Sequence, residues 1–153
     1  MDVIRIFNGL GNQMSQYAFY LAKKRAHPFR TCFVTNRYDC ENVHNGYELG
    51  RVFGIRSSRL KENILYSFLS SHHIPFPGYR LFWHLTHEIK EAPNYDYDAG
   101  LLQPSRKFGF TFFWGGWHSE RYFSHLREEL LRVFSVDERK LNASCLKWAE
   151  RIR

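Results

Sequence analysis

Short apolar runs and helical spacing succeed each other in the first 35 residues of the chain. Residues 3–7, Val-Ile-Arg-Ile-Phe, form a mostly apolar run such as a buried strand has. After a glycine-rich turn, apolar side chains recur at helical spacing over residues 14–22. His27-Pro28 ends that pattern, because the residue before a proline avoids helical backbone. Residues 31–35 then form a second apolar run, so this part predicts a strand–helix–strand unit of a parallel sheet.

The same pattern predicts further helices and one more strand. Leu49, Val52 and Phe53 indicate a short helix that Gly54 ends. Four more helices are expected over residues 60–69, 81–89, 126–134 and 141–152, and a strand over residues 108–114. Strands that alternate with helices favour an α/β fold. We therefore expect a Rossmann-like parallel sheet with flanking helices, in one domain that spans residues 1–153.

The composition of the chain says more about its binding partner than about its fold. The net charge is +7 and 18% of the residues are aromatic, which favours anionic partners such as nucleotides, phosphates, nucleic acid or an acidic membrane face. The basic residues are scattered instead of clustered, so we expect no nucleic acid as partner. Neither a leader peptide nor a long apolar segment is evident. These features predict a cytoplasmic protein, with peripheral association at the inner membrane surface as a compatible location.

The three cysteines, Cys32, Cys40 and Cys145, do not have the spacing of a disulfide framework. Reduced thiols are expected, with Cys32 and Cys145 as small core residues. A zinc site from Cys32, Cys40 and His44 matches no structural-zinc spacing.

A glycine pair after the first strand is the first candidate site. Gly9 and Gly11 lack the third glycine of the dinucleotide fingerprint, because position 14 is Met14, and they lack the lysine of a phosphate-binding loop. A tight turn that lets the helix pack on the strand would explain them equally well. Asn12 and Gln13 add to the ligand interpretation, because side-chain amides in a first helical turn can join free backbone N–H groups in binding an anion.

A second candidate site lies in the stretch Phe-Phe-Trp-Gly-Gly-Trp-His, residues 112–118. Two glycines let the backbone approach a ligand or another segment closely. Trp114 and Trp117 beside them could form an aromatic platform for a sugar, or both rings could lie in the core.

Carboxylates and histidines give no convincing metal site. Asp96 and Asp98 could chelate a divalent cation on an extended chain, but they fall in an expected loop. His84 and His87 could share a helix face, and no third ligand is evident. We expect no metal and no other cofactor.

Three stretches together resemble one enzyme family. They are Gly-Leu-Gly-Asn-Gln-Met-Ser-Gln-Tyr-Ala at residues 9–18, His-Asn-Gly-Tyr-Glu-Leu at 44–49, and Gly-Gly-Trp-His-Ser-Glu-Arg-Tyr-Phe at 115–123. In this order they resemble the bacterial α-1,2-fucosyltransferases, glycosyltransferase family eleven. The family has Gly where this chain has Asn8 and Phe where it has Ser15, and neither change removes the Gly-Asn-Gln core.

The resemblance implies a GT-B-type architecture of two Rossmann-like domains and metal-independent, inverting transfer of L-fucose. The donor would be GDP-fucose, and the acceptor the 2-hydroxyl of a galactose-terminated glycan. By position, Gly9, Gly11, Asn12 and Gln13 would face the donor, and Trp114 and Trp117 would line the acceptor cleft; for the catalytic base, His44 and Glu120 are candidates by chemistry alone.

The family's Arg-Arg motif, which contacts the donor diphosphate, does not occur in this chain. We therefore expect residues 1–153 to form the N-terminal half of a GT-B-type glycosyltransferase, without its C-terminal GDP-fucose-binding domain, and to be inactive alone. A non-catalytic carbohydrate-binding domain and a basic nucleic-acid-binding module are the two alternatives.

Overall fold

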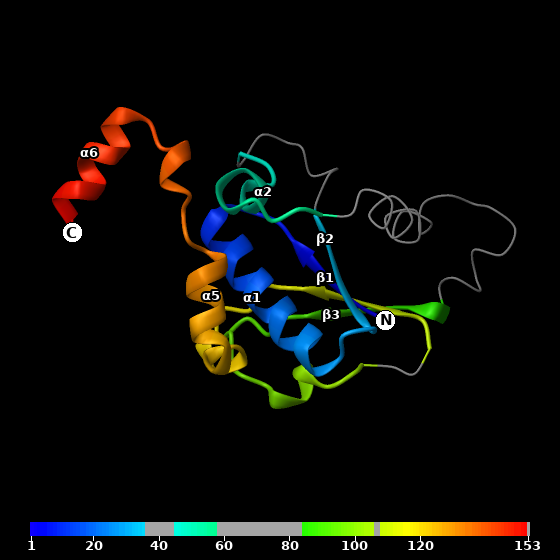
Figure 1. Ribbon diagram of the computed structural model, residues 1–153. Helices are drawn as coiled ribbons and strands as arrows, with labels where there is room; N and C mark the ends of the chain where they lie inside the picture. Colours follow the sequence, from blue (N-terminus) through cyan, green and yellow to red (C-terminus); the bar gives the residue numbers. More distant parts are fainter. Residues whose placement is uncertain (36–44, 58–83, 106–107, 153) are drawn as a thin grey trace, which may run out of the picture.

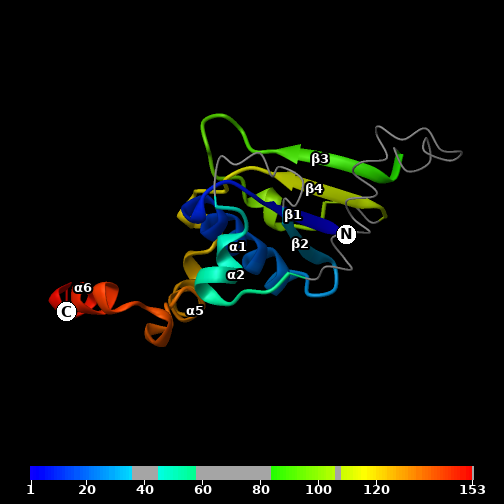
Figure 2. The ribbon, with the colours of Figure 1, turned by 90° about the horizontal axis from the view of Figure 1, so that it is seen from above.

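Four parallel strands form the centre of the protein. The computed structural model describes residues 1–35, 45–57, 84–105 and 108–152. In chain order the strands are β1 (Asp2–Ile6), β2 (Thr31–Thr35), β3 (Thr86–Lys90) and β4 (Phe110–Trp114). They pair in the order β2-β1-β4-β3, as Figure 2 shows from above. The protein thus has an α/β fold with an all-parallel, Rossmann-like sheet.

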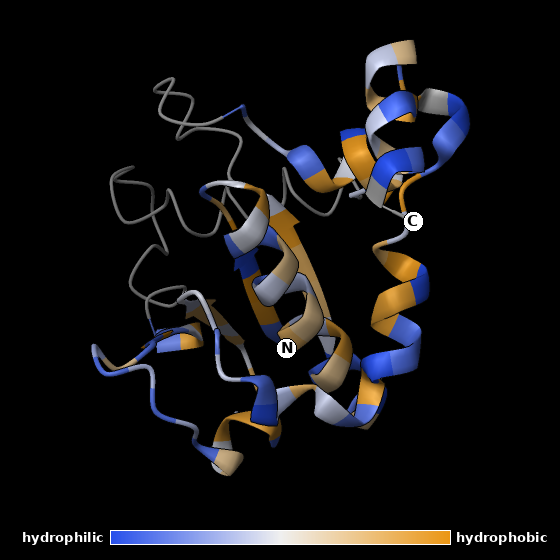
Figure 3. Ribbon diagram, turned by 90° about the vertical axis from the view of Figure 1, so that its left-hand side faces the viewer, coloured by the Kyte–Doolittle hydropathy of each residue, from blue (hydrophilic) through white to orange (hydrophobic). Residues whose placement is uncertain are grey.

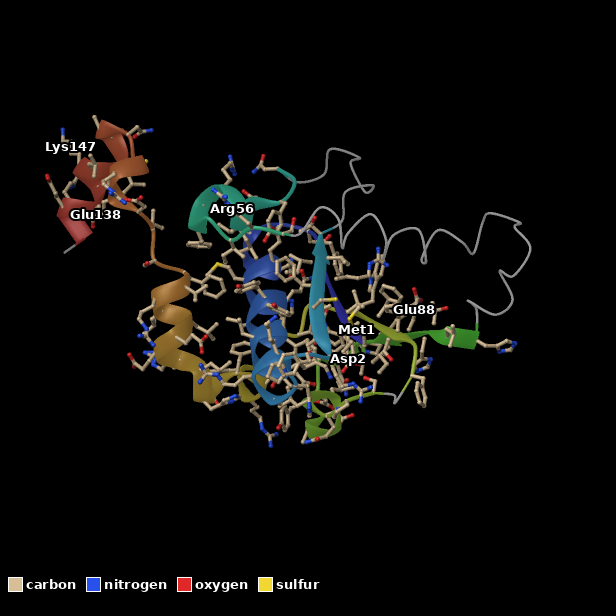
Figure 4. The ribbon with its side chains drawn as sticks, turned by 45° about the vertical axis from the view of Figure 1, so that its right-hand side comes forward. Met1, Asp2, Arg56, Glu88, Glu138 and Lys147 are labelled. Atoms are coloured by element: carbon tan, nitrogen blue, oxygen red, sulfur yellow. The ribbon has the colours of Figure 1, made fainter. Side chains whose placement is uncertain are left out.

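The described helices do not all lie against this sheet (Figure 1). They are α1 (Leu10–Ala26), α2 (Glu48–Phe53), α5 (Arg127–Val133) and α6 (Ala143–Ile152), with short 3₁₀ turns η1 (Ala99–Leu102), η2 (Glu120–Tyr122), η3 (Ser124–Leu126) and η4 (Glu138–Lys140). Helix α5 lies beside α1, and the Arg25 guanidinium donates to Glu129 across the two helices at 2.6 Å. Helix α6 extends away from the sheet, with Glu138 and Lys147 on this outlying segment (Figure 4).

Alternate residues of the strands fill two apolar layers, as the two-residue period of a strand requires. On the side of α1, Ile4 and Phe113 pack with Phe19 and other rings of the helix. On the other side, Val3 and Phe112 pack with Val34. The hydrophobic strands behind α1 are visible in Figure 3.

A buried ion pair fixes α1 to β1. The Lys23 ammonium lies 2.8 Å from the Asp2 carboxylate, and both side chains are almost fully buried. Lys23 also donates to the carbonyl oxygens of Leu101 and Gln103, at 2.6 and 2.9 Å. Burial lowers the pKa of Lys23, and Asp2 opposes that shift. The three acceptors tie the strand and η1 to one helical side chain.

Several expectations are confirmed and two are wrong. The strand–helix–strand unit is present, and Gly54 ends α2 with a left-handed φ of 71°. The helix expected over 81–89 is wrong from residue 86 on, because Thr86–Lys90 forms the edge strand β3; residues 84–85 are helical, and 81–83 lie outside the described residues. Cys145 is also not a core residue: it is exposed, whereas Cys32 is half-buried. The helix expected over 60–69 and Cys40 lie outside the described residues.

Candidate functional site

The carboxyl ends of β1 and β4 lie next to each other in the middle of the sheet. The chain leaves β1 through α1 to β2 on one side, whereas β4 lies on the other side of β1. Open α/β sheets bind ligands outside the carboxyl ends of their strands. The glycine turn after β1 and the loop of residues 115–119 after β4 both lie at this edge, so the two candidate stretches belong to one region.

The side chain of Gln13 joins the glycine turn to the segment before α2. Its amide nitrogen donates to the carbonyl oxygens of Asn8 at 2.6 Å and Gly46 at 2.8 Å. Its amide oxygen accepts from the backbone N–H groups of Glu48 at 2.9 Å and Leu49 at 3.3 Å. These four bonds use the full capacity of the amide. Gln13 is buried, so in this conformation it positions the turn and does not present its amide to a ligand.

The side chain of Gln16 joins the same turn to the loop after β4. Its amide oxygen accepts from the Phe7 N–H at 2.9 Å, and its amide nitrogen donates to the Gly115 carbonyl at 3.0 Å. The side chain is fully buried between the two strand ends. Together, two glutamine amides one helical turn apart link three stretches that are distant in the sequence.

The remaining residues of the turn are more open. Asn8 has a left-handed φ of 65°, a conformation that asparagine tolerates and glycine adopts freely. Gly9 is the N-cap of α1 and gives no side-chain hydrogen bond, and no acidic residue lies in the first turn. A Cβ at Gly11 would meet no atom within 4 Å. Asn12 is half-buried, and its side chain has no hydrogen bond to any described residue. An anion would therefore meet free N–H groups and the positive end of a helix dipole here.

The two tryptophans differ in their surroundings. Trp117 is fully buried and stacks on Phe19, with ring centroids 4.6 Å apart. Its ring offers no face to a sugar, which corrects the expected place of Trp117 in an acceptor cleft. Trp114 is half-buried, under the Arg5 guanidinium at 3.3 Å from the ring centroid and beside Phe7 at 5.0 Å. Of the two expected cleft residues, Trp114 is thus the partly accessible one, with the Arg5 guanidinium over its ring.

The two glycines before Trp117 make room for other segments of the chain. A Cβ at Gly115 would lie 2.4 Å from the Cβ of Glu91, and a Cβ at Gly116 would lie 2.2 Å from His118 Nε2. His118 Nδ1 is 3.2 Å from the Ser15 hydroxyl of α1, so this loop meets the helix at a second point. The sequence motif did not show which segment the two glycines approach. In the structure, Gly115 lies against Glu91 at the end of β3, and Gly116 lies against His118 of the same loop.

Of the two candidate bases, the structure describes only Glu120. His44 lies outside the described residues, and Glu120 is exposed in η2. Of the Asp-x-Asp pair, Asp96 accepts a hydrogen bond from the Asn94 amide, and Asp98 caps η1 through the Gly100 N–H at 2.7 Å. His84 and His87 do not share a helix face, because His87 lies in β3.

Across the ranges that the structure describes, no three His, Cys, Asp or Glu side chains gather as a metal site would need. A search of the same ranges for a helix with the length and apolarity of a membrane span returned none.

Comparison with protein-family models, with curated proteins and with solved structures found no match for this chain.

Proposed function

We propose that this chain is the N-terminal, Rossmann-like half of an inverting α-1,2-fucosyltransferase. The complete enzyme would transfer L-fucose from GDP-fucose to the 2-hydroxyl of a terminal galactose. The proposal rests on the resemblance of the three sequence stretches, and the structure supplies a geometric reason for taking them together.

The observation that carries the proposal is the convergence of these stretches. Gln13 of the first stretch bonds Gly46 and Glu48 of the second. Gln16 of the first bonds Gly115 of the third. Unrelated coincidences of sequence would have no reason to meet at one edge of a sheet, where α/β proteins bind nucleotides. This supports a common site and not three separate matches.

The chemistry assigned to the site is a direct displacement. The acceptor 2-oxygen would form a bond to C1 of fucose while the bond from C1 to the GDP phosphate oxygen breaks. A base would take the hydroxyl proton, and GDP would leave with the electron pair. The groups at the start of α1, with Asn12 beside them, would face negative charge that grows on the departing phosphate. Fixed donors of this kind stabilise developing charge without having to reorganise.

Asn12→Ala in the complete enzyme tests the proposal. The Asn12 side chain is half-buried and has no hydrogen bond to described residues, so its loss should spare the fold. Removal of one fixed donor lowers kcat by about 10²–10³ in studied enzymes, and a loss of this order is expected here. The assay is formation of 2-O-fucosylated galactoside from GDP-fucose.

Gln103→Ala is the matched control, because it truncates an exposed side chain near Lys23, away from the turn. Full activity of the Asn12→Ala enzyme would show that the glycine turn takes no part in the reaction. Failure of the unaltered complete enzyme to fucosylate any galactose-terminated acceptor would overturn the proposed function itself.

A further inference from the structure

The loop after β4 is held by a carboxylate from the end of β3. Glu91 Oε2 accepts hydrogen bonds from two consecutive backbone N–H groups, from Gly116 at 2.6 Å and from Trp117 at 2.9 Å. Consecutive peptide N–H groups that converge on one oxygen form an anion-binding concavity. We propose that the N–H pair of Gly116 and Trp117 is an oxyanion-binding site that Glu91 fills, and that small carboxylates occupy it when the Glu91 side chain is removed.

The backbone around this site is shaped for the carboxylate. Trp117 has a φ of 53°, a left-handed conformation that is unfavourable for a bulky residue. Strain of this kind persists where the surroundings enforce it. The buried Trp117 ring anchors the loop on one side, and the Glu91 carboxylate bonds it on the other. Gly115 completes the site, because a Cβ there would lie 2.8 Å from Glu91 Oε2.

The surroundings of the second carboxylate oxygen, Oε1, support the proposal independently. Glu91 Oε1 is buried, and no described group donates a hydrogen bond to it. A carboxylate that is partly withdrawn from water depends on the donors that it does have. Here those donors are the N–H groups of Gly116 and Trp117. Loss of these two hydrogen bonds would therefore destabilise both the carboxylate and the loop.

Occupation of the site also positions a polar contact between the loop and α1. The imidazole of His118 folds over Gly116 and approaches the Ser15 hydroxyl of α1. Glu91 therefore acts as a positioning residue for the loop that carries His118. This inference goes beyond the proposed function, because the site exists whatever reaction the protein catalyses.

Chemical rescue of Glu91→Ala in the 153-residue chain is the test. The variant leaves two donors and a space the size of a carboxylate, so its Tm should fall by about 5 °C or more. Sodium formate should restore most of that loss along a saturating curve. Sodium chloride at equal ionic strength should not.

Glu88→Ala is the matched control, because Glu88 is an exposed glutamate of β3 (Figure 4). Formate should leave the Tm of this control and of the unaltered chain unchanged. Absence of a formate response in Glu91→Ala, or an equal response in all three proteins, would overturn the proposal.

Glu91→Gln keeps the proposal testable if the alanine variant does not fold. The glutamine amide retains the shape and one acceptor oxygen but removes the charge. The amide proton resonances of Gly116 and Trp117 should then move upfield more than any others, because charge-assisted hydrogen bonds are the stronger ones. Unchanged resonances for these two protons in a folded Glu91→Gln chain would contradict the site.

Discussion

Replacement of Gly11 by alanine should raise stability and weaken donor binding at the same time. Gly11 is the second residue of α1 and is exposed, and an added Cβ would meet no atom within 4 Å. Its φ is not in the left-handed region, so alanine fits the helix without strain. Alanine is favoured over glycine in a helix by about 0.5–1 kcal/mol. For a chain of this size the gain corresponds to a rise in Tm of about 1–4 °C.

The same substitution should lower the affinity for GDP-fucose. In the proposed function the donor pyrophosphate lies against the free N–H groups beside Gly11. A methyl group there would push the phosphate away and weaken a hydrogen bond to a charged group, which is worth roughly 1.5–3 kcal/mol. A loss at the lower end lowers affinity by about tenfold. Calorimetric titration of the complete enzyme with GDP-fucose measures this loss, and thermal unfolding of the same sample measures the gain.

Gly54→Ala is the matched control for Gly11→Ala. It makes the same chemical change, and a Cβ there would also meet open space, but Gly54 has a φ of 71°. Left-handed backbone costs an alanine about 1–2 kcal/mol, so this variant should lose stability and keep its affinity. A stabilised Gly11→Ala enzyme that binds GDP-fucose as tightly as before would refute the placement of the donor at this turn. A destabilised one would refute the reasoning about the helix.

Two further predictions concern buried side chains. Gln16→Leu leaves the Phe7 N–H and the Gly115 carbonyl without their partner, at about 1–3 kcal/mol for each group. Urea titration should show a loss of roughly 2–6 kcal/mol in the free energy of unfolding, and a loss below about 1 kcal/mol would contradict the bridging role. Burial raises the pKa of Tyr17 and of Tyr20 to about 12, while tyrosine in an unfolded chain titrates near pH 10. The unfolded state releases these protons first, so stability should fall as the pH rises from about 10 to 12. Tyr20→Phe should reduce the slope of the urea midpoint against pH, and an unchanged slope would count against this origin.

The local part of the fold could be predicted from the sequence. The β1–α1–β2 unit and the end of α2 at Gly54 depend on spacing and on backbone preference, which neighbouring residues determine. Strand β3 could not be predicted, because none of its residues is buried and Ile89 is its one apolar side chain. Its pairing with β4 decides its conformation, and residues 81–89 on their own favour a helix.

The sequence drew attention to the glycine turn and to the loop after β4, but the contacts that their side chains make could not be predicted. Gln13 was expected to contact the donor, because it follows the glycines in the first turn of a helix. Its partners include Gly46, 33 residues away, and those of Gln16 include Gly115, 99 residues away. No local pattern signals such distant peptide groups. Glu91 was missed for the same reason, although the Gly115-Gly116 pair signals that some segment comes close.

The order of the strands also determines when the sheet can be completed during synthesis. Strand β1 is made first, yet it lies in the interior of the sheet, where Asp2 pairs with Thr111 of β4. At about 5–20 residues per second, β4 leaves the ribosome roughly 5–20 s after β1. Until then β1 can pair only with β2, and its other edge and the amide nitrogen of Gln16 lack their partners. The central ladder is therefore a late step of folding, and a chaperone that shields one open strand edge during this interval would be expected to raise the yield of folded protein.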